Sequence, residues 1–283
     1  MPSDVIFRAV AGFRLVTAKP DLLMGFYQAL GFVVGAMTPI PAAEMTVLGL
    51  WGAGWRRSLT LGESRLDLDS FDHPGRSYPD RTSASDLVFQ HLALVTDDAR
   101  AAWRRARNAG ATPITRGEPV TLPPSSGEVT AVKFRDLEGH PLELLEFPAG
   151  SNTLWQGSGT MGIDHSAISV ADIVASRRFY ERRGLAGGTR TLNEGPAQVA
   201  LDGLDDVEVD VLPMTPPNKQ PHVELLRYRQ PVGQPHTPLA ANDVAATRIA
   251  WWSNRDALVR DPDGHLHQLM RQDRSPTNTA SRL

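Results

Sequence analysis

The sequence predicts an α+β protein in which one unit, a strand and a helix followed by about three strands, is repeated four times. With 283 residues, the chain can form one large or two ordinary domains, each with a substantial core. The repeat is clearest where Phe89–Val95 recurs in outline as Ile163–Ser169, because each copy opens a strand with a histidine. Gly31, Gly110 and Gly184 follow helix-like segments at corresponding places, where a helix C terminus favours a left-handed residue.

The elements of each unit follow from the spacing of apolar residues, which is three to four for helices and two for strands. We expect the first unit to have a strand at 13–16, a helix at 21–30 and a strand at 66–68. The second has a strand at 89–95, a helix at 98–109 and a hairpin at 129–136 and 141–147. The third has a strand at 163–170, a helix at 172–183 and strands at 197–201, 207–212 and 222–228. The fourth is truncated: a strand at 246–252 leads directly to 256–260 and 265–270, which leaves no room for a helix.

Composition excludes several classes of function. The chain has no cysteine, so disulfides, thiolate metal sites and a cysteine nucleophile are excluded, and His, Asp and Glu remain as strong metal ligands. The 29 basic and 32 acidic residues are nearly balanced, and the arginine pairs at 104–105 and 182–183 fall on expected helix surfaces, so we expect no nucleic-acid partner. No segment approaches the roughly 20 apolar residues that span a bilayer, and no signal peptide is recognisable. We therefore expect a cytoplasmic protein with no membrane partner.

The repeated histidines are expected to face a cavity. Strand alternation places His91 on the same face as Ala93, and His165 on the same face as Ala167. A small residue beside each histidine leaves space next to the imidazole. This pattern favours a cavity over a filled core.

Two glutamates complete a candidate metal site. Glu143 and Glu224 lie in apolar strands at matching places in units two and three, and a buried carboxylate is costly unless a cation or hydrogen-bond donor meets it. A single strand histidine is usually structural, but His91 and His165 recur in register, each followed by a matching glutamate. Two histidines and two glutamates predict a divalent metal, with Fe, Zn, Ni or Mn left open.

Several motifs resemble those of the vicinal oxygen chelate superfamily, which includes glyoxalases, extradiol dioxygenases and bleomycin-resistance proteins. The motifs are Gly25–Phe32, Asp164–His165, Arg178–Leu185, Arg135–Leu144 and Arg260–Leu266, and together they cover nearly the whole chain. The resemblance implies tandem βαβββ modules that form two cupped, open mixed β-barrels, the fourth module being truncated. It also implies the metal ligands His91, Glu143, His165 and Glu224, with Glu143 or Glu224 as the catalytic residue that transfers a proton.

Units one and four depart from this pattern. Unit one has Gly12 or Phe13 at the histidine position, although Asp67 matches the closing carboxylate as a ligand or as an edge-strand charge, the latter being favoured. Unit four has Arg248 for the histidine and Gln268 for the glutamate. We expect Arg248 to pair with a carboxylate rather than to bind an anionic substrate.

The pairing of the units decides whether the site is complete. Along the chain we assign 1–150 to an N-terminal domain with modules one and two, 151–273 to a C-terminal domain with modules three and four, and 274–283 to a disordered tail. If the modules also pair in this way, neither barrel has a full ligand set. If module two instead pairs with module three, one barrel collects all four ligands, and we prefer this arrangement.

Other residues receive structural interpretations. We expect His140 and His265 to satisfy turn backbone groups, His267 to lie at the surface, and Trp251 with Trp252 to fill the gap left by the missing helix.

Two functions follow. The first is a metal-dependent enzyme acting on a small oxygen-chelating substrate. If all four ligands bind, the resemblance implies lyase or isomerase chemistry, and three ligands, two His and one carboxylate, resemble the set of a ring-cleaving dioxygenase. The alternative is a metal-free small-molecule binding or resistance protein of the same fold. The partner in either case is a small molecule, and a homodimer stays open.

Overall fold

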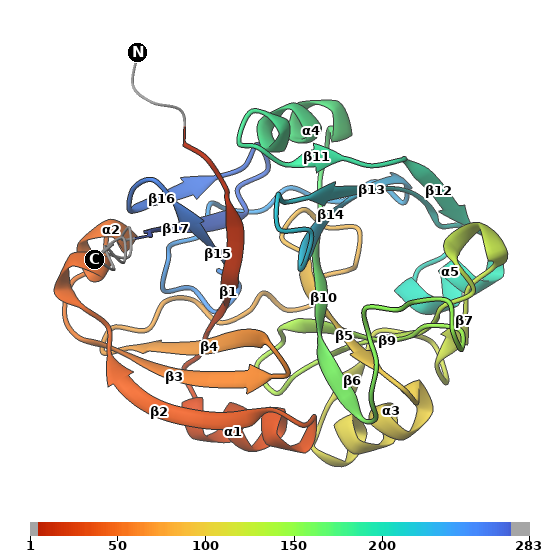
Figure 1. The fold of residues 1–283 in the computed structure, drawn as a ribbon, viewed down its shortest axis with the longest axis horizontal. Helices are drawn as coiled ribbons and strands as arrows, with labels where there is room; N and C mark the ends of the chain where they lie inside the picture. Colours follow the sequence, from red (N-terminus) through yellow and green to blue (C-terminus); the bar gives the residue numbers. More distant parts are fainter. Residues whose placement is uncertain (1–4, 273–283) are drawn as a thin grey trace, which may run out of the picture.

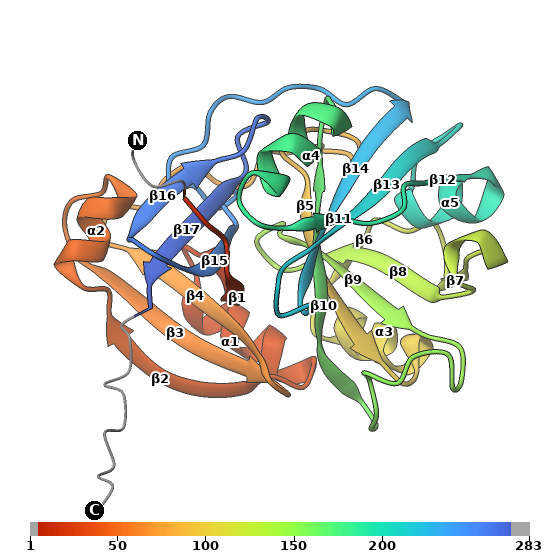
Figure 2. The same cartoon turned by 45° about the horizontal axis from the view of Figure 1, so that its top comes forward.

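The computed structural model describes residues 5–272 and contains two curled β-sheets that lie side by side (Figures 1 and 2). One sheet has seven strands, in the order β16 (Ala257–Arg260), β17 (Leu266–Arg271), β15 (Arg248–Ser253), β1 (Ala9–Val16), β4 (Ser64–Phe71), β3 (Gly54–Leu61) and β2 (Val33–Pro39). The other has ten. Its main order is β11 (Ala186–Gly187), β13 (Glu208–Thr215), β14 (His222–Gln230), β10 (Thr160–Ser169), β5 (Gln90–Thr96), β9 (Pro141–Glu146), β8 (Thr130–Arg135) and β6 (Thr112–Pro113). The short strands β12 (Thr191–Glu194) and β7 (Val120–Thr121) pair with β13 and β8.

The ten-stranded sheet contains the strands of units two and three. The seven-stranded sheet contains the strands of units one and four. In the ten-stranded sheet β5 and β10 run antiparallel at the centre, and in the seven-stranded sheet β1 pairs with β15 in the same way. The predicted fold class and the preferred pairing are therefore confirmed. The boundary assigned at residue 150 falls between β9 and β10, which belong to the same sheet, so it does not coincide with a division between the sheets. The tail assigned to 274–283 lies outside the described residues.

The helices α1 (Pro20–Ala29), α3 (Ala99–Asn108) and α4 (Ile173–Glu181) lie within two residues of their predicted ends. Residues 248–271 contain no helix between their strands, as predicted for unit four. The strand expected at 197–201 is wrong, because this segment belongs to helix α5 (Gly195–Asp202). A proline in its first turn and Gly203, with φ +64°, after its last residue are typical helix boundaries. Two further helical segments were not predicted, α2 (Ala42–Leu48) and the short 3₁₀ turn Pro124–Ser126.

The apolar strand faces pack beneath the helices, as the alternation predicted. Leu92 and Leu94 belong to a buried cluster with Trp103 of α3, and Ile168 belongs to the same cluster with Tyr180 of α4. Ala93 and Ala167 are absent from this cluster and lie on the opposite strand faces. The cavity side of the ten-stranded sheet is therefore kept separate from its helix side. None of the helices in residues 5–272 has the length and hydropathy that crossing a bilayer requires.

The prediction that His267 lies at the surface is wrong. His267 is fully buried, accepts a hydrogen bond from Trp251 Nε1 at 3.0 Å, and lies 3.0 Å from the Tyr180 hydroxyl. The reason is that the face of β17 that carries His267 packs against Phe7 and against Phe179 and Tyr180 of α4, the helix of unit three. Trp251 is buried and stacks on Phe7, as a residue filling a gap would, whereas Trp252 is partly exposed.

The two hairpin histidines connect the sheets as well as satisfying turns. The ring of His140, from the hairpin β8–β9, contacts the carbonyl of Val16 in β1 at 3.0 Å. The ring of His265, just before β17, contacts the carbonyl of Ser169 in β10 at 3.0 Å. Each histidine therefore reaches from its own sheet to the end of a central strand in the other.

Candidate metal centre

Four adjacent strands of the ten-stranded sheet bring the predicted ligands to one cavity of about 510 Å³. The ligands are Glu143 on β9, His91 on β5, His165 on β10 and Glu224 on β14. In the strand register Ala93 lies beside both His165 and Glu143, and Ala167 lies beside both His91 and Glu224. These alanines leave the space into which the longer side chains converge.

The distances between the polar atoms suit a single cation. His91 Nε2 lies 2.9 Å from Glu143 Oε2, and His165 Nε2 lies 3.9 Å from the same oxygen. Two atoms that each bind a metal at about 2.0–2.2 Å can be at most about 4.4 Å apart. His91, Glu143 and His165 offer ligand atoms that all lie within 4.8 Å of one another. Glu224 is outside this group, but its Oε2 lies 3.6 Å from His165 Nε2.

Two buried imidazole nitrogens, Nε2 of His91 and Nε2 of His165, support the fit of a metal. Within residues 5–272, no hydrogen-bond partner exists for Nδ1 and Nε2 of His91 or for Nε2 of His165. The 2.9 Å approach of His91 to Glu143 lacks the alignment of a hydrogen bond. Buried polar atoms almost always have a partner, and an ion is one recognised explanation when they do not. The donor set, two imidazoles and one or two carboxylates, is one that Zn, Fe, Ni or Mn accepts.

Asp164 and His222 also belong to this site and were not predicted as its members. Asp164 Oδ2 lies 3.0 Å from His165 Nδ1, which leaves Nε2 facing the cavity, and Trp155 Nε1 donates to the other carboxylate oxygen at 3.0 Å. His222 Nε2 lies 3.5 Å from Glu224 Oε1. Since His222 precedes Glu224 by two residues on the same strand, alternation alone places both on one face, and this signal could have identified it.

The titration of the two ligand histidines differs. Burial lowers the pKa of His91 and outweighs the opposing effect of Glu143, so this ring is neutral at pH 7, as a ligand must be. Burial acts in the same direction on His165, but Glu224 and Asp164 outweigh it and raise the pKa of His165 to about 9. Burial would raise the pKa of Glu224, but His165 and His222 lower it to about 2. In the metal-free protein, His165 therefore carries a proton that a bound cation would replace.

Lys133 was also missed by the sequence analysis. It lies on β8 directly beside Glu143 and lines the same cavity, and its Nζ contacts Asp202 at 2.6 Å. Asp202 also accepts hydrogen bonds from Tyr228 and Gln198. Burial would raise the pKa of Glu143, but Lys133 and His91 outweigh it and lower that pKa. Lys133 therefore helps to keep this carboxylate ionised.

The seven-stranded sheet has different residues at the corresponding register positions. Gly12 takes the place of His91, and a Cβ there would lie 2.9 Å from the carbonyl oxygen of Arg65, with φ at +150°. Arg248 takes the place of His165 and contacts Asp69 at 2.6 Å, so the predicted pairing with a carboxylate is confirmed. Asp67 takes the place of Glu143 and forms an ion pair with Arg65 at 3.0 Å. In the described chain, a guanidinium group thus takes one of the two imidazole positions of the other sheet, and a glycine takes the second.

Comparisons with solved structures agree with this architecture. Glyoxalase I from Zea mays is similar over 93% of this chain and 92% of that chain, with a TM-score of 0.58 and 15% sequence identity. A single-residue mutant of that enzyme gives a TM-score of 0.60 at 14% identity over the same shares of both chains. A "putative dioxygenase" from Bacillus subtilis is similar over 94% of this chain and 86% of that chain, with a TM-score of 0.57 and 12% identity. No protein-family model and no curated protein sequence matches the chain.

The chain therefore has the glyoxalase/dioxygenase fold, the fold of the vicinal oxygen chelate superfamily. Its structural neighbours are glyoxalase I and a dioxygenase-like protein, as the motif resemblance implied. At 12–15% identity the likeness concerns the fold.

Proposed function

We propose that the protein is a divalent-metal-dependent enzyme of the vicinal oxygen chelate superfamily that acts on a small substrate with two adjacent oxygen atoms. The observation that carries this proposal is the set of buried imidazole nitrogens that have no hydrogen-bond partner within residues 5–272 and face Glu143. A metal bound there would supply Lewis acidity to the substrate oxygens. His91, Glu143 and His165 would hold it.

Within this proposal Glu224 is the proton-transferring residue. Its side chain is 23% exposed, whereas that of Glu143 is 6% exposed, so Glu224 is the carboxylate that a ligand in the cavity can reach. A positioned carboxylate can remove a proton from a carbon atom and return it to a neighbour. Two histidines and one carboxylate alone would suit dioxygenase chemistry. Because Glu224 lies beside the group of His91, Glu143 and His165 as a second carboxylate, we favour lyase or isomerase chemistry.

Metal analysis of the purified protein tests the site. We expect about one divalent metal per chain, lost in the His91→Ala and His165→Ala variants and in their combination. His236→Ala is the matched control, because this half-buried histidine does not line the cavity of the candidate metal centre and its Nδ1 lies 2.8 Å from the carbonyl oxygen of its neighbour Thr237. Glu143→Gln should also lose the metal, whereas Glu224→Gln should retain it. A parent protein without metal, or variants that retain it, would exclude the proposal.

The metal-free alternative is a protein that binds a small apolar molecule in the same cavity. Apolar side chains in the lining of the cavity favour it, among them Leu122, Val129, Leu145, Val209 and Leu226. The same metal analysis separates the two functions, because only the enzyme requires the ion.

A further inference from the structure

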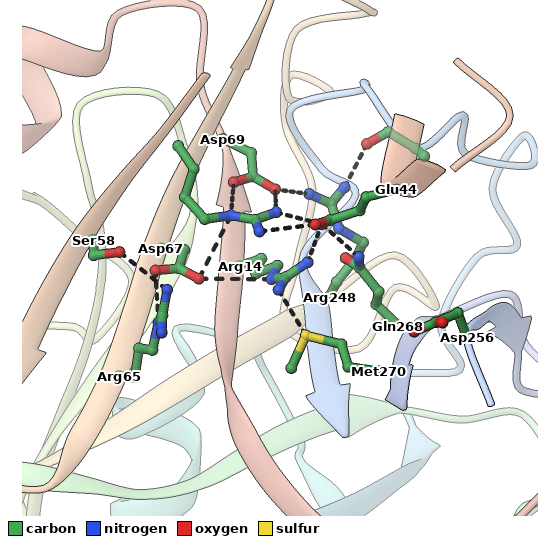
Figure 3. Close-up of polar contacts among 12 residues, drawn as sticks. Arg14, Glu44, Ser58, Arg65, Asp67, Asp69, Arg248, Asp256, Gln268 and Met270 are labelled. Atoms are coloured by element: carbon green, nitrogen blue, oxygen red, sulfur yellow. Dashed lines mark hydrogen bonds and ion pairs between the residues drawn. The ribbon is translucent and has the colours of Figure 1, made fainter. Parts of the chain in front are cut away.

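Three arginine side chains are buried together in the seven-stranded sheet, at the place that corresponds to the metal centre of the other sheet. They are Arg14 on β1, Arg56 on β3 and Arg248 on β15, which we call the arginine cluster. Figure 3 labels Arg14 and Arg248 of this cluster. Their exposed fractions are 3%, 7% and 0%. Burial and the neighbouring Arg56 lower the pKa of Arg14 to about 10, so it remains charged at neutral pH.

The sheet itself supplies fewer negative charges than positive ones. Asp69 accepts hydrogen bonds from Arg56 at 2.7 and 2.8 Å and from Arg248 at 2.6 Å. Asp67 lies 3.6 Å from both Arg14 and Arg56, and its hydrogen bond goes to Arg65. Two carboxylates therefore face three buried guanidinium groups, and an uncompensated buried charge is strongly destabilising.

The missing negative charge comes from outside the sheet. Glu44 projects from α2 into the arginine cluster, where Arg14 donates a short hydrogen bond to it and Arg56 donates two, at 2.6 and 3.1 Å (Figure 3). Gln268 Nε2 donates a further hydrogen bond to the same carboxylate at 2.7 Å. The cluster is therefore arranged to hold a carboxylate group, which planar guanidinium groups recognise with paired hydrogen bonds.

Glu44 is the least enclosed member of this network. Its side chain is 18% exposed, compared with 8% or less for the three arginines. It borders a cavity of about 210 Å³ that Gln268 and Met270 also line. Within the described chain, Nε of Arg14, Nε of Arg248 and Oε1 of Gln268 are buried without a hydrogen-bond partner, so Glu44 leaves part of the site unsatisfied.

We propose that the arginine cluster is a second ligand site, for a small carboxylate anion, and that Glu44 occupies it as an internal ligand until the anion displaces it. The bound anion uses the hydrogen bonds that Arg14, Arg56 and Gln268 now donate to Glu44. When Glu44 is displaced, α2 loses its polar contacts with the sheet. The helix is then held by its buried residues Met45 and Leu48. The site is independent of the proposed metal centre, because it lies in the other sheet.

Malonate, a small dicarboxylate, is the probe for the first test. Titration calorimetry should show saturable binding to the wild-type protein. Glu44→Gln should bind about tenfold more tightly or better, because the competing internal carboxylate is removed and the competent state becomes the main one. Glu63→Gln is the control, since this glutamate is exposed in the β3–β4 turn of the same sheet and should leave the affinity unchanged. Arg14→Met in the Glu44→Gln background should abolish binding, because Arg14 donates to the carboxylate that the anion replaces.

Amide hydrogen exchange of the wild-type protein gives a second test that does not depend on the folding of any variant. Malonate should increase exchange across residues 42–49, and sodium chloride at equal ionic strength should not. Equal malonate affinity of wild type and Glu44→Gln, or an unchanged exchange rate in α2 up to the solubility limit of malonate, would show that Glu44 and the arginines are only a structural ion network.

Discussion

At the scale of single residues, His140 has a role that its position in a turn did not indicate. Its Nδ1 lies 2.8 Å from Asp136, and its Nε2 lies 3.0 and 3.1 Å from the carbonyl oxygens of Val16 and Val244. Both ring nitrogens therefore face acceptors, and only the charged imidazolium can donate from both. Burial would lower the pKa of His140, but Asp136 outweighs this effect and raises it.

This pKa predicts a dependence of stability on pH. Below about pH 6.5, the unperturbed value, His140 is protonated in the folded and unfolded states, and its stabilising effect is fully present. The effect is lost as the pH rises through the higher pKa of the folded state, and it amounts to about 1.4 kcal/mol for each pH unit between the two pKa values. Urea unfolding should show that the difference in the free energy of unfolding between wild type and His140→Gln becomes smaller as the pH rises. A constant difference would contradict the prediction.

Gly12 gives a second prediction at this scale. Gly12→Ala should lower the free energy of unfolding by about 1–3 kcal/mol, because φ is +150° and the added Cβ would lie 2.9 Å from Arg65 O. Gly25 is the matched control in α1, where a Cβ meets nothing within 4 Å. Gly25→Ala should raise the free energy by about 0.5–1 kcal/mol. Chemical denaturation measures both, and equal effects of the two substitutions would show that position 12 tolerates a side chain.

At the scale of elements, the sequence predicted what depends on local periodicity. Strand alternation places His91 with Ala93 and His165 with Ala167 on the cavity face, and the alternate residues Leu92, Leu94 and Ile168 pack on the opposite face beneath the helices. Helix α5 was missed because its apolar residues also fit a short strand, and periodicity cannot separate the two over five residues.

The arginine cluster could not be predicted from the sequence, for another reason. Arg14, Glu44 and Arg248 come from β1, α2 and β15, and each looks like an ordinary charge on its own element. They meet only because β1 pairs with β15, and no local pattern encodes that pairing. The candidate metal residues were easier to predict, since the repeated unit itself showed where corresponding strands carry His and Glu.

Strand pairing also predicts how fragments behave. Residues 1–150 alone should not unfold cooperatively, because β5 loses its partner β10 and β1 loses its partner β15. Two central strands would then expose unpaired edges, which favour aggregation. Circular dichroism during thermal unfolding, with light scattering, tests this. A sharp transition of a monomeric 1–150 fragment would show that the boundary at residue 150 does define a domain.

At the scale of the whole molecule, the proposed metal centre should link metal binding to global stability. A divalent metal at about 100 times its dissociation constant should raise the free energy of unfolding by about 2.7 kcal/mol, provided that only the folded state binds it. The gain should be reversed by a chelator and absent from the combined His91→Ala/His165→Ala variant. Thermal unfolding with and without metal measures it, and an equal gain in that variant would place the metal elsewhere.

In the sequence, the segment that forms the ten-stranded sheet lies between the two segments that form the seven-stranded sheet. This arrangement has a consequence for the order of folding. All strands of the ten-stranded sheet lie between residues 90 and 230, whereas the seven-stranded sheet needs strands from both ends of the described chain. Closing a longer loop costs more conformational entropy, and contacts between distant residues form slowly. In pulse-labelled refolding, amides of β5 and β10 should therefore gain protection before those of β1 and β15, so that the candidate metal pocket forms before the arginine cluster closes.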